Sequence, residues 1–140
     1  MSRRKSRIIA FQGLYSLEVG KIPLDDVLAL SWVNKADVES FNSEEGAFAR
    51  LLIAGTVEHL SEIDELIKKN LTTWDFDRVN KVSLSVLRMS IFSLLYQKDI
   101  LPSIVIDEAI NISREFGPDD SFKFVNALLD NIRKSMDAKN

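Results

Sequence analysis

The sequence predicts an all-α protein that folds as one domain over residues 1–140. Apolar residues recur every three or four positions along most of the chain, which is the helical period. No segment alternates as a strand does, and only 5 glycines and 3 prolines are available for turns, so the connections must be short. A chain of this length buries a stable core without disulfides or metals. We therefore expect a globule of about seven helices around a buried central one.

The first half of the chain is expected to hold three helices. Apolar spacing predicts the first over residues 3–18, with Gly20 as its stop. Pro23 then opens a short helix whose first turn holds two aspartates, which suit the positive end of a helix. Residues 34–43 are polar and mixed, which is typical of a loop.

A long third helix is predicted over residues 44–70, capped by Ser43. Gly55 inside it costs about 1 kcal/mol relative to alanine, unless a close helix crossing needs the space. His59 lies among glutamates on this helix, and we interpret it as a surface histidine beside acids.

The second half begins with a short helical turn near residues 76–79. From Ser83 onwards the next segment is apolar nearly all round, which indicates the central buried helix. A break at residues 99–102 precedes a helix that Ser103 can cap, and Gly117-Pro118 ends that helix.

The last helix follows this stop directly. Three neighbouring residues can cap it: Asp119, Asp120 and Ser121. Arg133 and Lys134 lie near its C-terminal end, where cations are favoured.

The net charge of -3 conceals a segregation of charge. Residues 1–17 carry four basic side chains and no acid, whereas the rest of the chain carries 14 basic and 21 acidic ones. The basic residues all lie in the segment 1–7: Arg3, Arg4, Lys5 and Arg7. A basic end on an acidic body indicates a local contact with a polyanion such as nucleic acid. A solvated tail and a mitochondrial presequence remain as alternatives.

Two aromatic residues are candidate platforms for a nucleobase. Tyr15 follows the basic segment on the same predicted helix, and Phe124 lies on the last helix. Aromatic rings stack on the bases of single-stranded nucleic acid. Each ring could instead belong to the core.

The composition argues against an enzyme. Without cysteine the chain has no thiolate nucleophile or metal ligand, and with one histidine it offers little for a relay of acids and bases. No Gly-rich phosphate loop is present, and the adjacent acidic pairs do not share a helical face. No apolar run approaches the roughly 20 residues that span a membrane. We expect no catalytic residue, metal or cofactor.

Two charged residues lie on otherwise apolar helices. They are Arg88 and Glu108. Because an isolated buried charge is expensive, one hypothesis is that they pair with each other and join two helices. The alternative is that both point outward.

Several segments together resemble the NusB family of bacterial transcription antitermination factors. The resemblance begins with Arg3-Arg4-Lys5-Ser6-Arg7 and Gln12-Gly13-Leu14-Tyr15-Ser16, and continues with Phe48-Ala49-Arg50-Leu51-Leu52 and Val86-Leu87-Arg88. It ends with Ile106-Asp107-Glu108-Ala109, Phe116-Gly117, Asp119-Asp120-Ser121 and Lys123-Phe124-Val125-Asn126. Each motif is weak alone, but their joint order and spacing are specific.

The resemblance implies a fold of two packed helical subbundles with a long shared helix. It also implies a cytoplasmic, non-catalytic protein that binds boxA, a short single-stranded RNA in ribosomal RNA operon leaders. The expected partner is the small-subunit ribosomal protein NusE, which the family would meet along the central helix near residues 83–92. RNA polymerase and other Nus factors would join indirectly, and the complex would support ribosomal RNA transcription and maturation. The family also allows a homodimer that buries the RNA-binding face.

The resemblance assigns RNA-binding residues one by one. The basic cluster matches the arginine-rich start of the family, and Tyr15 matches its RNA-proximal tyrosine. Three positions at the start of the last helix match further RNA contacts: Asp120, Lys123 and Phe124. Two positions depart from the pattern, since the family commonly has Glu at Ser93 and Gly at Ala127. An alternative is a NusB-like helical adaptor or an accessory domain for an RNA-modifying enzyme.

Overall fold

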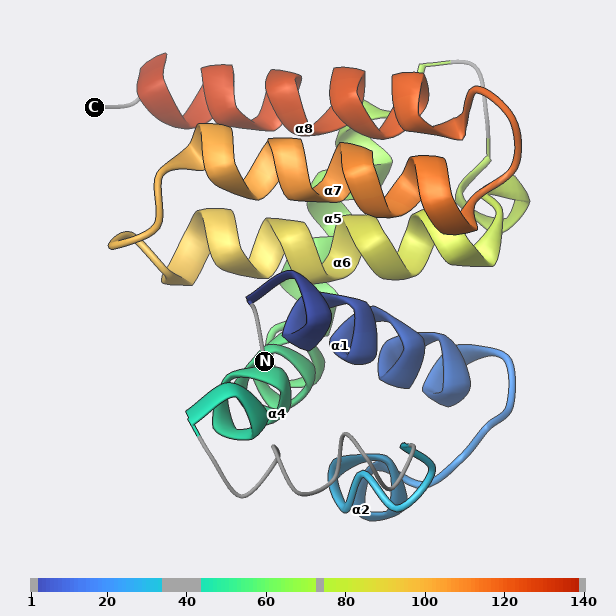
Figure 1. Ribbon diagram of the computed structural model, residues 1–140. Coiled ribbons are helices and arrows are strands. Elements are labelled where there is room, and N and C mark those ends of the chain that lie inside the picture. Colours follow the sequence, from blue (N-terminus) through green and yellow to red (C-terminus); the bar gives the residue numbers. More distant parts are fainter. Residues whose placement is uncertain (1–2, 34–43, 73–74, 139–140) are drawn as a thin grey trace.

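The computed structural model describes residues 3–33, 44–72 and 75–138. Over these ranges the chain forms seven α-helices and one turn of 3-10 helix, and no strand (Figure 1). This confirms the predicted all-α class. The loop expected at 34–43 lies outside the described ranges, and so does Ser43, the expected cap of the helix that follows it.

The first subbundle consists of α1 (Arg3–Glu18), α2 (Leu24–Leu28) and α4 (Glu44–Glu58), which contact one another. Helix α1 buries the apolar side chains of Ile9, Phe11 and Leu14. Helix α1 is therefore part of the folded core.

The second subbundle consists of α5 (Leu60–Asn70), α6 (Lys81–Tyr96), α7 (Pro102–Phe116) and α8 (Ser121–Ala138). In Figure 1, α6, α7 and α8 lie side by side as a layer, and α5 crosses behind them. The 3-10 turn, Phe76–Arg78, precedes α6.

Helix α6 is the centre of the molecule. It contacts α1 and α4 on one side and α5, α7 and α8 on the other. Every residue from Ser83 to Leu94 is buried, as its apolar composition predicts. The helix starts two residues earlier than expected, because Asn80 caps it by accepting a hydrogen bond from the Ser83 main-chain N–H at 2.8 Å.

The helix predicted over residues 44–70 is present as two helices, α4 and α5, separated at His59. The backbone of His59 leaves the helical region, with φ -107° and ψ 21°. This break lets α4 pack against α1 and lets α5 pack against α8. The Gly55 backbone meets the Phe92 ring of α6, so the close crossing that would justify a glycine is present.

The prediction that Ser103 caps α7 is wrong. The helix begins at Pro102, because proline has no N–H to lose in the first turn and its φ suits that position. The predicted stop is confirmed, since α7 ends at Phe116 and Gly117 follows as its C-cap. Of the three cap candidates for α8, Ser121 makes no cap, because its buried hydroxyl oxygen has no hydrogen-bond partner.

Candidate nucleic-acid interface

The basic cluster lies on the first two turns of α1, and no acidic residue offsets it there. Cations at the positive end of a helix dipole do not stabilise the helix. Their position is therefore better explained by an anionic ligand than by helix stability. Lys5 is exposed, and so are Arg3 and Arg4.

Two of these arginines lie over one aromatic ring of α4. The guanidinium carbon of Arg3 is 3.9 Å from the centroid of the Phe48 ring, and that of Arg7 is 5.4 Å away. Arg7 is only 7% exposed, so it packs inside the fold more than it faces a ligand. Burial lowers the pKa of the Arg7 guanidinium. The positive charge of Arg3 lowers this pKa further, whereas the negative charge of Glu108 raises it.

The third arginine has an acidic partner. Arg4 Nε lies 3.3 Å from Glu108 Oε2, and Arg4 Nη2 lies 3.4 Å from Glu108 Oε1. The Arg4 side chain is nevertheless 55% exposed. It can therefore turn from this carboxylate to a phosphate oxygen without leaving the surface.

This geometry corrects the hypothesis that Arg88 pairs with Glu108. Arg88 instead pairs with Asp64 of α5 and Glu18 of α1, at 2.9 Å and 3.3 Å. The buried arginine does need a counter-charge, as predicted, but the helix crossing brings two other carboxylates to it. Glu108 lies on α7 and pairs with Arg4 at the basic end of α1.

Tyr15 lies at the other end of α1. Between Arg4 and Tyr15 the helix rises by about 16 Å, yet a separation of three full turns puts both on one face. Tyr15 borders a recess with Phe116 of α7, whose ring packs against Phe11 at a centroid distance of 5.2 Å. Tyr15 is thus a surface residue and not a core residue.

The remaining predicted residues lie at the start of α8. Lys123 is exposed, and its Nζ lies 3.5 Å from Asp120 Oδ1. Asp120 itself has φ 64°, a left-handed conformation that aspartate tolerates better than most residues. Such backbone conformations are often found at binding sites.

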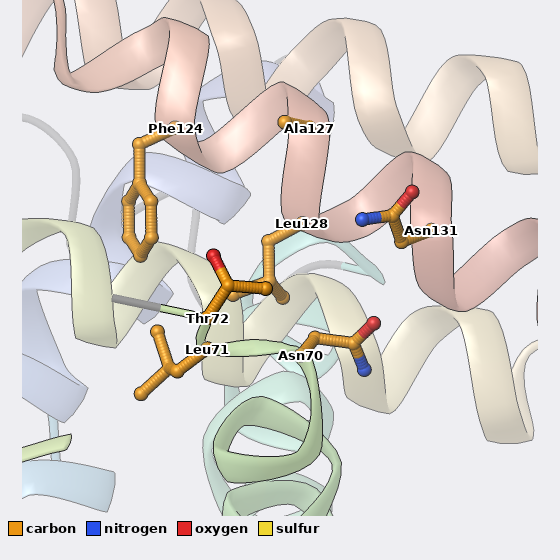
Figure 2. A pocket seen from close by; sticks show the side chains of 7 residues that line it. All are labelled: Asn70, Leu71, Thr72, Phe124, Ala127, Leu128 and Asn131. Carbon is orange, nitrogen blue, oxygen red and sulfur yellow. The ribbon is translucent and has the colours of Figure 1, made fainter. Parts of the chain in front are cut away.

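Phe124 is half-buried and packs against the core, so it is both a core and a surface residue. Figure 2 shows it at one side of a small pocket between α8 and the chain that follows α5. Ala127 and Asn131 lie further along α8 at the same pocket, and Asn70 lies opposite them.

The structure therefore distributes the predicted site residues over two ends of the molecule. Arg3, Arg4 and Arg7 lie near the α6–α7 connection, whereas Tyr15 lies near the turn between α7 and α8 (Figure 1). The outer face of α1 joins the two ends.

Sequence reasoning missed three residues of this surface: Phe48, Trp32 and Phe116. Nothing in their local pattern distinguishes them from core aromatics. The position of Gln12 could have been predicted from the sequence, because helical spacing places it between Arg4 and Tyr15 on one face.

Within the described ranges, no group of acidic or histidine side chains is arranged to hold a metal ion. In the same ranges, none of the helices combines the length and apolar character needed to span a membrane.

An all-α core with exposed arginines and an exposed tyrosine along one helix is the arrangement expected of a small helical nucleic-acid-binding protein. The NusB family model matches residues 4–134. The chain belongs to the NusB family.

Relatives cover nearly the whole chain. The transcription antitermination protein NusB of Treponema denticola is 48% identical over 133 residues, which are 95% of this chain and 96% of the relative. The protein of the same name from Borreliella burgdorferi is 34% identical and covers 94% of each chain.

Solved structures agree with the fold. The crystal structure of NusB from T. maritima matches with a TM-score of 0.85 at 36% identity, and covers 96% of this chain and 92% of that chain. A structure of the antitermination factors NusB and NusE in complex with double-stranded RNA matches with a TM-score of 0.77. It covers 96% of this chain and 99% of that chain, and at 24% identity it supports the fold alone.

Proposed function

We propose that this protein is a transcription antitermination factor that binds boxA-type single-stranded RNA together with the ribosomal protein NusE. The relatives named above are antitermination proteins, and one solved neighbour pairs NusB with NusE on RNA. The observation that carries the proposal is the face of α1, where exposed arginines and Tyr15 lie in line. The protein would thereby support the transcription and maturation of ribosomal RNA.

The mechanism is electrostatic docking followed by base recognition. Arg3, Arg4 and Lys5 contact phosphates, which fixes the position of the strand but carries no sequence information. Tyr15 and Phe124 stack on unstacked bases, and polar neighbours contact the base edges. Asp120 would repel a phosphate, so it suits a base amino group.

The acidic body explains the need for a partner. Outside the first 17 residues the chain carries 14 basic and 21 acidic side chains, which complement a basic ribosomal protein. We place NusE along α6 and expect RNA polymerase and other Nus factors to join through the complex. A homodimer would compete, because it would bury the RNA-binding face.

The proposal treats residues 1–140 as one non-catalytic RNA-binding domain whose basic segment is 1–7. It also places the protein in the cytoplasm, where ribosomal RNA is transcribed. None of these steps requires a metal or a cofactor.

A titration of labelled boxA-type RNA tests the proposal, using a scrambled RNA of the same length as the matched control. It is run with and without NusE. The proposal predicts that NusE raises the affinity for boxA-type RNA well above that for the scrambled RNA. Equal binding of both RNAs by the NusE complex would contradict antitermination through boxA.

A further inference from the structure

The ring of Phe48 lies beneath the basic end of α1. The guanidinium carbons of Arg3 and Arg7 lie 3.9 Å and 5.4 Å from its centroid, and both distances are within the roughly 6 Å over which an aromatic face attracts a cation. Phe48 is only 7% exposed, so little of the ring is open to a ligand. The ring is therefore placed to act on the arginines and not on an RNA directly.

Without such a ring, this arrangement of arginines would be unfavourable. Arg3 and Arg7 are four residues apart on α1, where like charges repel each other. Both also lie near the positive end of the helix dipole. The negative face of the Phe48 ring offsets part of this repulsion. The ring thus supports a cluster of charges that would otherwise separate.

The two arginines over this ring differ in exposure. Arg7 is buried, so it is held within the fold whatever it contacts. Arg3 is exposed and is the first residue of α1. Because helix ends fray, a long side chain at this position samples many rotamers unless a neighbour restrains it. The contact with Phe48 supplies that restraint for Arg3.

An aromatic ring restrains an arginine without occupying its hydrogen-bond donors. The N–H groups of a guanidinium lie in its plane, whereas a ring attracts the cation through its face. Glu108 instead occupies two donors of Arg4, at 3.3 Å and 3.4 Å. Arg3 keeps its donors for the bidentate contact that a phosphate accepts. Since its side chain is already ordered, it also loses less conformational entropy on binding.

We propose that Phe48 is a positioning residue for RNA binding, which holds the Arg3 guanidinium over its ring so that the N–H groups face a phosphate. The inference rests on the proposed function and adds to it a core residue that acts on the RNA only through an arginine. The role requires the aromatic face of Phe48 and not merely its apolar volume.

NMR of the free protein tests the contact without any RNA. A ring shifts the resonances of protons above its face upfield, so the Arg3 side-chain protons should lie upfield of their usual positions. The variant Phe48→Leu keeps most of the apolar volume but should abolish this shift, whereas Phe48→Tyr keeps the ring face and should retain it. Arg3 resonances that do not change in Phe48→Leu would overturn the contact.

Titration of boxA-type RNA in the presence of NusE tests the role in binding. Phe48→Leu should lower the affinity about two- to fivefold, which corresponds to about 0.5 to 1 kcal/mol for a cation–π contact at an exposed site. The slope of log affinity against log salt should not change, because Arg3 keeps its charge. Phe48→Tyr should restore the affinity of the unaltered protein.

The matched control is Ile53→Val, a mild change at a fully buried residue of the same helix. It should lower the melting temperature and leave RNA affinity unchanged. An equal loss of affinity in Ile53→Val and Phe48→Leu, or in Phe48→Tyr and Phe48→Leu, would show an effect of the fold and would overturn the positioning role.

A double-mutant cycle shows whether Phe48 acts through Arg3. In the background Arg3→Ala, Phe48→Leu should have little further effect on the affinity for RNA. A loss of undiminished size in that background would overturn the proposal, and would indicate that the ring contacts the RNA itself. If the unaltered protein with NusE bound boxA-type and scrambled RNA equally, the proposed function would fail, and the NMR comparison would still show whether Phe48 holds Arg3.

Discussion

Arg88 and Asp64 form a bidentate ion pair at the centre of the molecule. Arg88 Nε and Nη2 each donate a hydrogen bond to one Asp64 oxygen, both at 2.9 Å, and Arg88 Nη1 lies 3.3 Å from Glu18 Oε2. The three residues belong to α6, α5 and α1, so the cluster joins the two subbundles. Parallel hydrogen bonds of this kind fix the relative orientation of the groups as well as binding them.

Replacement of this arginine should destabilise the fold. Arg88→Met removes the buried cation that Asp64 and Glu18 share, which costs about 3 to 5 kcal/mol. Urea unfolding measures the loss. In a double-mutant cycle, Asp64→Asn should be strongly coupled to Arg88→Met, whereas Glu108→Gln should be additive. Additivity with Asp64→Asn would contradict the pairing.

Acid should weaken the same cluster through Glu18. Partial burial raises the pKa of the Glu18 carboxyl, but Arg88, Lys81 and Lys21 outweigh that effect, and the net pKa is below its ordinary value. A carboxyl with a lowered pKa stabilises the fold above its unfolded pKa, and this contribution is lost as the pH falls through the folded pKa.

The variant Glu18→Gln isolates this contribution. It should be less stable than the unaltered protein by about 1 kcal/mol at pH 7. The difference should begin to shrink as the pH falls below the ordinary glutamate pKa of about 4.3. It should vanish only below the lowered pKa of the folded protein, where Glu18 is also neutral. A difference independent of pH would contradict the assignment.

The crossing of α4 and α6 requires Gly55. A Cβ at this position would lie 2.2 Å from Phe92 Cζ, and Phe92 is buried. Gly55→Ala should therefore destabilise the protein by about 1 to 3 kcal/mol, although alanine is the better helix former by about 1 kcal/mol. The second change Phe92→Leu should recover part of the loss. A stabilised Gly55→Ala protein in thermal melting would exclude the close crossing.

Glu108 should compete with RNA for Arg4. An exposed ion pair contributes about 0.2 to 1 kcal/mol, so its removal should raise the affinity for RNA by a factor of about 1.4 to 5 at low salt. The matched control for Glu108→Gln is Asp107→Asn, which removes the same charge from the adjacent exposed position. If both variants changed the affinity equally, the effect would be one of net charge and not of the Arg4 contact.

Helix periodicity predicted the helices from the sequence well, because the burial of an apolar stripe depends on local spacing. The starts of two helices, α6 and α7, were not predicted correctly. Asn80 caps α6 before its apolar run begins, and Pro102 starts α7 without a capping side chain.

The partners of charged residues could not be predicted in the same way. A buried, paired Arg88 was one of two hypotheses, but its true partners Asp64 and Glu18 reach it only through the crossing of three helices. Likewise, the burial of Arg7 depends on how α4 docks Phe48 against α1. The recess at Tyr15 depends on the turn at Leu30, which no periodic pattern specifies.

The salt dependence of RNA binding tests the central claim most directly. The variant Arg3→Ala/Arg4→Ala removes two exposed phosphate contacts, so the slope of log affinity against log salt should become shallower by about 1.4. The control Lys69→Ala/Lys134→Ala removes two exposed charges from α5 and α8, outside the basic end of α1, and should leave the slope unchanged. Equal slopes for all three proteins would contradict the claim that the basic end of α1 binds the RNA backbone.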